Sequence, residues 1–328
     1  MMGDFPLREA RSEYGDALPT EPEPGAVLIT GIVGRLGKRV CRVLHRTRPV
    51  IGVDRRDFPD KPRDVTHHRI DPRRKKLKDV FRAGNIKAVV HLGVMHDPRA
   101  SASDHHSWNV VGFAKMLEFL SRYRVPKLVV LSSANVYGPR PDNPQFLTEE
   151  APLLGSQDFS EIRDLIEVDM LAQSFFWRQS QCETVILRST HILGPVRNAP
   201  SNYLRLPVTP TLMGFDPMVQ VIHHDDVVRA IEAALRPGVR GIFNIAGPEP
   251  APLSKLLKIL RRPRLPVPHD VGREMLKALF KYRLSSFPAP ELDHIRYVCM
   301  VDDRRARDAM GWRPRHNLEE TVRAVEDP

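Results

Sequence analysis

Residues 26–37 read A-V-L-I-T-G-I-V-G-R-L-G, and this stretch decides the fold. The run A-V-L-I is short and apolar, which is typical of a strand buried on both faces of a parallel sheet. Three glycines follow at the spacing G-x-x-G-x-x-G, and apolar residues then recur with helical period. A strand, a glycine turn and a helix in this order predict a phosphate cradle, because the free N–H groups and the dipole of the helix N-terminus attract an anion.

Each glycine of the turn has a physical task. Gly31 permits the tight turn, Gly34 lets the backbone approach a pyrophosphate, and Gly37 allows the helix to pack closely on the strand. The same spacing also occurs in turns that only pack a helix and bind no ligand. The strand before the turn and the helix after it favour the binding interpretation.

A second strand-like run, residues 49–53, ends at Asp54. A carboxylate at this place accepts both ribose hydroxyls of an adenosine, which favours NAD over NADP. Arg55 and Arg56 follow directly and suit a 2′-phosphate, so NADP is the less favoured alternative.

The rest of the N-terminal half alternates strands with helices. Further buried strands are expected at 88–92, 128–131, 184–187 and 241–246, with helices at 108–123 and 159–179. This alternation predicts an α/β fold with right-handed crossovers, a Rossmann-type doubly wound parallel sheet.

Composition divides the chain into three parts. Residues 1–24 lack periodicity and are expected to form a flexible tail, and prolines crowd the chain after about residue 195. We therefore expect a dinucleotide-binding domain and a smaller, irregular C-terminal lobe that binds substrate. The expected limits are 25–195 for the domain, with 219–247 returning to it, and 196–218 with 248–328 for the lobe.

Overall composition excludes several classes of protein. The 328 residues include 41% apolar residues and carry a formal net charge of +10. Cys41, Cys182 and Cys299 are too few and too far apart for a disulfide scaffold or a four-cysteine zinc site, which suits the cytoplasm. No apolar run approaches the ~18 residues that span a bilayer, and because the first residues include early acids and no apolar run we expect no secretory signal there. The basic run 73–78 reads as a solvated helix face without interleaved aromatics, so no nucleic-acid partner is expected.

Taken in order, these motifs resemble the extended short-chain dehydrogenase/reductases, also called NAD-dependent epimerase/dehydratases. The resemblance covers residue 26 to the C-terminus. It rests on T-G-I-V-G-R-L-G at 30–37, Asp71, H-L-G at 91–93, Asn109, L-S-S-A-N-V-Y-G at 131–138, G-P at 194–195, H-H-D-D-V-V at 223–228, G-I-F-N-I-A-G at 241–247 and the segment 301–314.

The resemblance implies an oxidoreductase or epimerase that binds NAD and a small-molecule substrate, such as a nucleotide sugar or another bulky hydroxyl or keto compound. Many members also form homodimers through a two-helix face. The cofactor contacts that it implies are Gly31, Gly34, Arg35, Leu36, Gly37, Asp54, Asp71, Leu92, Gly93 and Asn109.

The catalytic residues depart from the family pattern. The family uses a serine together with a Tyr-x-x-x-Lys pair on the next helix, and Ser133 matches the serine. The tyrosine position falls at Glu161 and the lysine position at Leu165, and no Tyr-x-x-x-Lys occurs anywhere in the chain. Tyr137 matches a separate, structural tyrosine of the family.

Two kinds of residue are candidates to replace the missing pair. Glu161 is either a carboxylate base or, with Asp158, part of a capping box, and Leu165 has the spacing of an ordinary core residue. His96 and His191 are either an acid–base pair or structural histidines. If none of these supports catalysis, the chain is a silent NAD(P)-binding sensor or scaffold.

Two further patterns concern metals and membranes. The histidine doublets lack the spacing of a zinc set and adjacent side chains are expected to diverge, so we expect no metal; Asp226 is expected to help close the lobe. Residues 255–283 alternate apolar and basic side chains. They form either an ordinary lobe helix, a pocket rim for a lipid-like substrate, or a surface that contacts an anionic membrane.

Overall fold

The structure is a computed structural model. It describes residues 25–95, 100–155, 160–196, 198–268, 271 and 299–327, with the backbone alone at Ser160, Glu161 and Ala199. The expected tail at 1–24, His96 and the segment 272–298 lie outside the described residues.

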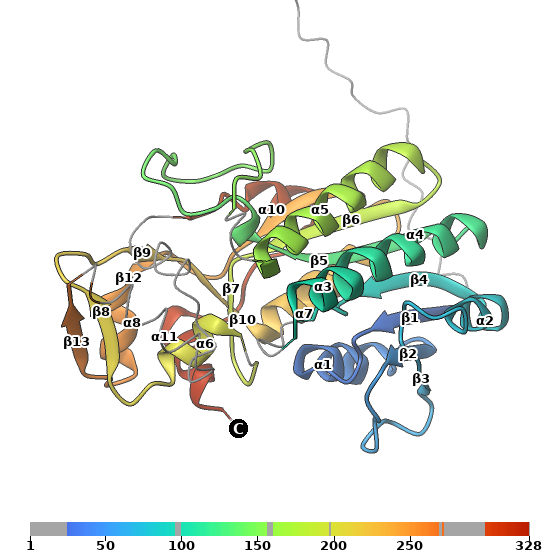
Figure 1. The fold of residues 1–328 in the computed structure, drawn as a ribbon, viewed down its shortest axis with the longest axis horizontal. Coiled ribbons are helices and arrows are strands. Elements are labelled where there is room, and N and C mark those ends of the chain that lie inside the picture. The colour runs from blue at the N-terminus through green and yellow to red at the C-terminus, as the bar shows by residue number, and fades with distance from the viewer. Residues whose placement is uncertain are drawn as a thin grey trace, which may run out of the picture.

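A parallel sheet of seven strands forms the centre of the molecule, in the order β11-β6-β5-β4-β1-β2-β3 (Figure 1). The strands are β1 (Ala26–Thr30), β2 (Val50–Asp54), β3 (Thr66–Arg69), β4 (Ile86–His91), β5 (Lys127–Ser133), β6 (Glu183–Ser189) and β11 (Gly241–Ile245). Every neighbouring pair is parallel, which confirms the predicted fold class. Strand β3 was not anticipated, because its sequence T-H-H-R is polar and it lies at the edge of the sheet.

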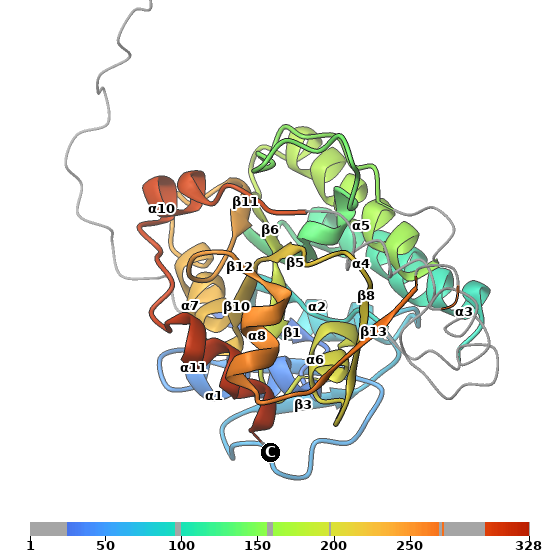
Figure 2. The same ribbon diagram turned by 90° about the vertical axis from the view of Figure 1, so that its left-hand side faces the viewer.

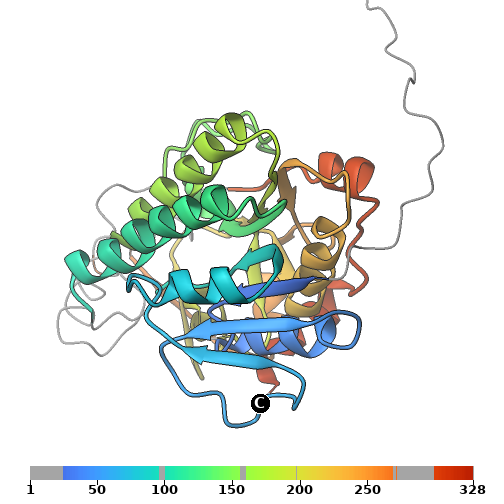
Figure 3. The same ribbon diagram turned by 90° about the vertical axis from the view of Figure 1, so that its right-hand side faces the viewer.

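Helices cover both faces of this sheet (Figure 3). One apolar core packs α1 (Arg35–Leu44), α7 (His224–Ala234) and α10 (Arg304–Met310) against the strands. The other packs α2 (Leu77–Ala83), α4 (Gly112–Arg122) and α5 (Ser160–Arg178). The short α3 (Ala102–His106) and a π-helical turn, η1 (Ser107–Val111), precede α4, and a 3₁₀ turn, η2 (Ala134–Val136), follows β5. Both faces of the sheet are thus buried, as continuous apolar strands require.

A smaller lobe lies beyond one end of the sheet, at the left of Figure 1. Its strand pairs are β7 (His191–Leu193) with β10 (Val221–His223), β8 (Thr209–Leu212) with β13 (Arg264–Val267), and β9 (Met218–Val219) with β12 (Ala251–Pro252). Its helical segments are α6 (Ala199–Leu204), α8 (Leu253–Ile259), α11 (Leu318–Arg323) and η4 (Ala324–Glu326). These elements enclose a separate apolar core.

Three further expectations concern the basic run, the cysteines and membrane-spanning helices. Most of the basic run is not a helix face: residues 73–76 form turns and a bend, and α2 begins at Leu77, whose side chain is buried. All three cysteines are free, and burial raises the pKa of the Cys41 and Cys182 thiols to about 11. Among the described helices we find none with the length and hydropathy needed to cross a bilayer.

Candidate active site

The glycine turn between β1 and α1 depends on the absence of side chains. Gly31 has a φ of +72°, and a Cβ there would lie 2.8 Å from the Leu92 carbonyl oxygen. A Cβ on Gly37 would lie 2.3 Å from the Gly31 carbonyl oxygen, so only glycine lets the helix approach the turn this closely. The turn therefore follows the geometry that the sequence predicted.

The N-terminus of α1 fits a pyrophosphate. Gly34 caps the helix in an extended conformation without a side-chain cap, and the first turn of α1 carries no acidic side chain. A Cβ on Gly34 would meet the Gly31 carbonyl oxygen at 3.0 Å. The donors of the helix N-terminus thus face an open cradle, which the positive end of the helix dipole makes attractive to phosphate oxygens.

A cleft of about 1010 Å³ joins this turn to the ends of β5 and β6. Seven of the expected cofactor contacts line it, namely Gly31, Gly34, Arg35, Leu36, Gly37, Leu92 and Gly93. The other three, Asp54, Asp71 and Asn109, do not line the cleft and make contacts within the protein.

Asp54 lies at the end of β2, where its carboxylate holds the glycine turn and an arginine. Oδ2 accepts the Val33 N–H at 3.1 Å, and the Arg56 guanidinium binds both oxygens at 3.0 and 2.9 Å. Burial alone would raise the pKa of Asp54, but the hydrogen bonds and charge of Arg56 outweigh it and leave the pKa below its ordinary value. Arg56 lines the cleft, so the pair of Asp54 and Arg56 shapes this end of the cleft.

Asp71 is engaged in the same way, two residues before an arginine. Its carboxylate accepts hydrogen bonds from the guanidinium of Arg73, the shortest at 2.6 Å. Arg73 and Arg55 both lie against the ring of Trp108, at 5.3 and 5.1 Å. Trp108 lines the cleft and donates its indole N–H to the Gly93 carbonyl at 2.8 Å, so this wall carries an aromatic ring that two guanidinium groups contact.

Asn109 lies in the π-helical turn and holds the loop after β4. Its amide oxygen accepts the Met95 N–H at 2.7 Å, and its amide nitrogen donates to the buried Asp164 at 3.3 Å. Met95 lines the cleft. Asn109 therefore positions the wall of the site from behind.

Ser133 ends β5 and faces the cleft, where its hydroxyl accepts the Asn135 N–H at 3.1 Å. The preceding Ser132 is buried, and its hydroxyl donates to Asp169 of α5 at 2.6 Å. Both serines line the cleft, but the Ser132 hydroxyl is engaged by Asp169 and anchors the strand to α5, whereas the Ser133 hydroxyl accepts a local backbone N–H.

A buried polar network lies behind Ser133. Arg188 of β6 forms an ion pair with Asp169 at 2.8 Å, and the two side chains are 1% and 0% exposed. Arg188 also donates to the Tyr137 hydroxyl at 2.8 Å, and that hydroxyl donates to Asn244 of β11 at 2.8 Å. Burial raises the pKa of Tyr137 to about 12. The network ties α5, β5, β6 and β11 together and gives Tyr137 a structural place, as expected.

The helix that would carry the family pair presents apolar side chains to the cleft. Leu165, at the lysine position, is 8% exposed, lines the cleft and packs with Ile162 in the adjoining core. Glu161, at the tyrosine position, is the second residue of α5, and its side chain lies outside the described residues. Its role therefore stays a prediction.

The lobe contributes polar groups to the far end of the cleft. His191 begins β7 and lines the cleft, and burial lowers the pKa of its imidazole to about 4. The neighbouring Thr190 also lines it, is 5% exposed, and its hydroxyl has no hydrogen-bond partner among the described residues. Thr190 could not be predicted from the sequence, because one threonine beside a strand has no distinctive spacing.

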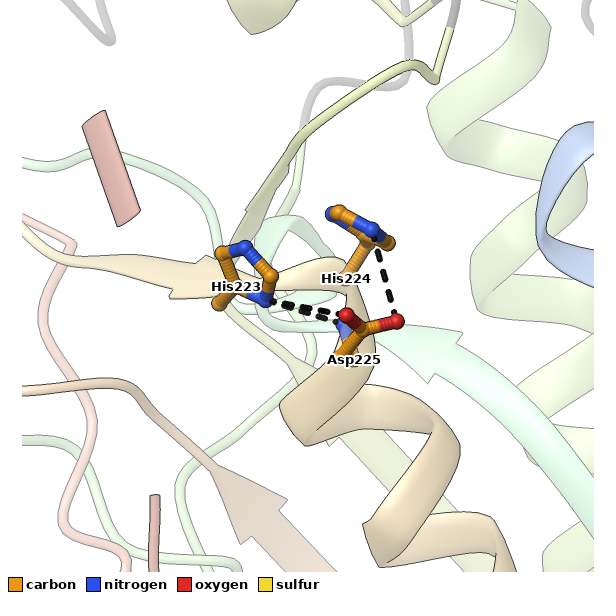
Figure 4. A group of neighbouring side chains, drawn as sticks. All are labelled: His223, His224 and Asp225. Carbon is orange, nitrogen blue, oxygen red and sulfur yellow. Dashed lines mark hydrogen bonds and ion pairs between the residues drawn. The ribbon is translucent and has the colours of Figure 1, made fainter. Parts of the chain in front are cut away.

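One histidine doublet has the donors of a metal site (Figure 4). The donor atoms of His223, His224 and Asp225 lie within 4.8 Å of one another, and the two rings are 4.2 Å apart rather than diverging. The donors are already in use: His223 Nδ1 accepts the Asp225 N–H at 3.2 Å, and Arg39 binds the Asp225 carboxylate at 3.0 Å. A guanidinium at the carboxylate opposes a cation, so we assign no metal to this group.

Asp226, the next residue, binds the C-terminal segment. Its carboxylate accepts the N–H groups of Arg315 and His316 at 3.1 and 3.2 Å and pairs with Arg229. It therefore ties α7 to the chain that leads into α11, in keeping with its expected role in the lobe.

Comparison with protein families decides the identity of this fold. Residues 27–246 match the model of the NAD dependent epimerase/dehydratase family. The chain belongs to this family. The match spans the glycine turn, Ser133 and the β6–β7 junction, so the resemblance noted from the sequence is confirmed.

Individual relatives agree with this assignment. The chain is 27% identical to an uncharacterised protein of Mycobacterium tuberculosis over 93% of its length and 83% of the relative's. It is 22% identical to the UDP-glucose 4-epimerase of Dictyostelium discoideum, over 92% and 95%. The solved UDP-glucose 4-epimerase of Thermotoga maritima has a TM-score of 0.73 at 18% identity, over 92% and 97%. This last likeness shows a shared fold.

Proposed function

We propose that this family member is an NAD-dependent oxidoreductase of the epimerase or dehydratase type that acts on a nucleotide sugar or a similarly bulky hydroxyl or keto compound. The observation that carries the proposal is the single cleft that joins the glycine turn to Ser133 and His191. Relatives named UDP-glucose 4-epimerase support a nucleotide-sugar substrate.

The residues of the cleft divide into three roles. The glycine turn and the first turn of α1 bind the pyrophosphate, and Arg56 with Asp54 meets the adenosine. NAD, when bound, supplies the hydride acceptor. The Ser133 hydroxyl orients the substrate oxygen, and the neutral imidazole of His191 and the free Thr190 hydroxyl bind substrate hydroxyls.

Proton transfer falls to Glu161 or His191. A group with a pKa near 4 is a weak base at neutral pH, so His191 suits hydrogen bonding better than proton transfer. We therefore assign the role of proton acceptor to Glu161. Its carboxylate needs no lysine to ionise, and burial would raise its pKa and make it a stronger base.

The test is the reduction of bound NAD by UDP-sugars, followed by the absorbance of the reduced nicotinamide. Ser133→Ala should lower the rate about 10²-fold, and Glu161→Gln should lower it more than His191→Asn. Ser121→Ala, at an exposed position of α4, serves as the control. Unchanged turnover in Ser133→Ala contradicts the proposal.

The apolar wall at Leu165 favours a second candidate, a silent NAD(P)-binding sensor. A leucine in place of the lysine puts no cation at this position of the cleft wall to hold the cofactor ribose or to lower the pKa of a neighbouring acid. This candidate predicts different affinities for NAD and NADH without turnover. Equal affinities would exclude it.

A further inference from the structure

The outer end of the lobe exposes an unusual number of large apolar side chains. Seven of the twelve that are most exposed among the described residues fall in two stretches of the lobe, 206–218 and 265–271. They are Leu206, Val208, Met213, Phe215, Met218, Leu265 and Val271. None of the seven lines the cleft, so substrate binding does not explain them.

Strand pairing places two of these side chains, Leu265 and Met213, on one unit. β8 and β13 run parallel, with Pro210 opposite Leu265 and Leu212 opposite Val267. The Met213 N–H donates to the Val267 carbonyl at 2.9 Å, so the chain that follows β8 stays beside the end of β13. Leu265 and Met213 are 53% and 57% exposed on this two-stranded unit.

Cations border the same unit. Residues 251–268 contain five lysines and arginines and no acidic residue. Arg262 pairs with Glu326, and no carboxylate of the described residues lies within ion-pair distance of the other four, which are exposed: Lys255, Lys258, Arg261 and Arg264. Figure 2 shows α8, which carries the lysines, on the same side of the molecule as β8 and β13.

Exposed apolar side chains beside exposed cations that have no ion-pair partner among the described residues suit an anionic lipid surface. Apolar groups enter the boundary between headgroups and acyl chains, while lysine and arginine stay at the level of the anionic headgroups. A second copy of the chain suits this surface less, because a two-fold interface would bring these cations against one another.

We propose that the face formed by β8, β13 and α8 docks the protein on membranes that contain anionic lipids. Apolar side chains led by Leu265, Met213 and Phe215 enter the interface, and Lys255, Lys258, Arg261 and Arg264 bind the headgroups. The docking face is distinct from the cleft and does not depend on the function proposed for it.

The test is co-sedimentation of the full-length protein with vesicles. Phosphatidylcholine vesicles that contain phosphatidylglycerol should retain the protein at low salt. Binding should fall at least about tenfold with phosphatidylcholine alone or at high salt, because each cation near the surface contributes to the attraction. Failure to bind the anionic vesicles at low salt overturns the proposal without any variant.

Matched variants then locate the face. Met213→Ser with Leu265→Ser, and separately Lys258→Glu with Arg264→Glu, should each lower binding at least about tenfold. The controls are Met170→Ser with Trp177→Ser, at side chains of α5 that are 57% and 76% exposed, and Arg63→Glu with Arg122→Glu.

Equal losses in the lobe and control variants would overturn the proposal. So would lobe substitutions that convert a dimer into a monomer in analytical ultracentrifugation, since the apolar face would then be covered by a second copy.

Discussion

The guanidinium of Arg56 binds both carboxylate oxygens of Asp54, with Nε 3.0 Å from Oδ1 and Nη2 2.9 Å from Oδ2. The Asp54 side chain is 5% exposed and that of Arg56 is 55% exposed. Asp54, the acid expected to discriminate against a 2′-phosphate, is thus neutralised by an arginine that lies between its carboxylate and the cleft.

Removing this arginine should sharpen the choice of dinucleotide. In Arg56→Ala, Asp54 faces the cleft as an unpaired carboxylate and repels a 2′-phosphate. The Kd for NADP should rise about tenfold or more, while the Kd for NAD changes by less than about threefold. Fluorescence titration with each dinucleotide measures both constants. Arg63→Ala, at an exposed position outside the cleft, should leave them unchanged, and equal losses for the two dinucleotides would contradict the prediction.

Restoring the family pair should restore its chemistry. Glu161→Tyr with Leu165→Lys places a phenol and a cation on α5 near Ser133, and we expect the rate of NAD reduction by a UDP-sugar to rise about 10²-fold. Stopped-flow absorbance measures the rate, and Leu165→Met alone is the control for repacking. An unchanged rate would show that the cleft lacks more than these two side chains.

The ion pair between Arg188 and Asp169 should contribute strongly to stability. Asp169→Asn leaves a buried guanidinium without its counter-charge, and we expect the free energy of unfolding to fall by about 3–5 kcal/mol. Glu319→Gln, in the exposed pair with Arg323, should cost less than about 1 kcal/mol. Urea denaturation compares the two variants, and similar losses in both would rule out a special role for the buried pair.

Stability should fall on mild acidification. Burial lowers the pKa of His91, His191 and His223 from 6.5 to about 4, so between these values the unfolded chain binds protons that the folded chain does not. The stability these groups contribute is present above pH 6.5 and is lost as the pH falls toward 4, at up to about 1.4 kcal/mol per pH unit for each histidine.

Urea denaturation between pH 7 and pH 5 measures this slope. His91→Gln removes one titrating group and should make the slope shallower than in the wild type. A free energy of unfolding that stays constant from pH 7 to pH 5 would contradict the assignment of neutral buried histidines.

The sequence predicted the central sheet because its strands are continuous apolar runs, a signal that burial on both faces imposes. It missed β3, whose polar side chains suit an edge strand. The glycine turn was predictable because steric limits at Gly31 and Gly37 allow no other residue. The ion pair between Asp54 and Arg56 could not be predicted from the sequence, because opposite charges two residues apart can also be separately hydrated. Only the fold determines which of the two side chains is buried.

The two serines at the end of β5 show a similar limit. The sequence identified Ser133 by its resemblance to the family, but the contact of Ser132 with Asp169 depends on how α5 lies across the sheet. Tertiary contacts of this kind have no local signature.

Asp169 lies one turn beyond Leu165 on α5, and Leu165 lies one turn beyond Glu161. Asp169 binds Ser132 of β5 and Arg188 of β6, so α5 is anchored to the sheet by a contact that does not involve residues 161 and 165. Residues 161 and 165 can therefore change in evolution while the anchoring contacts of α5 are kept. For the same reason α5 is a suitable place for protein design, because new pairs of side chains can be introduced at residues 161 and 165 while Ser133 is left unchanged.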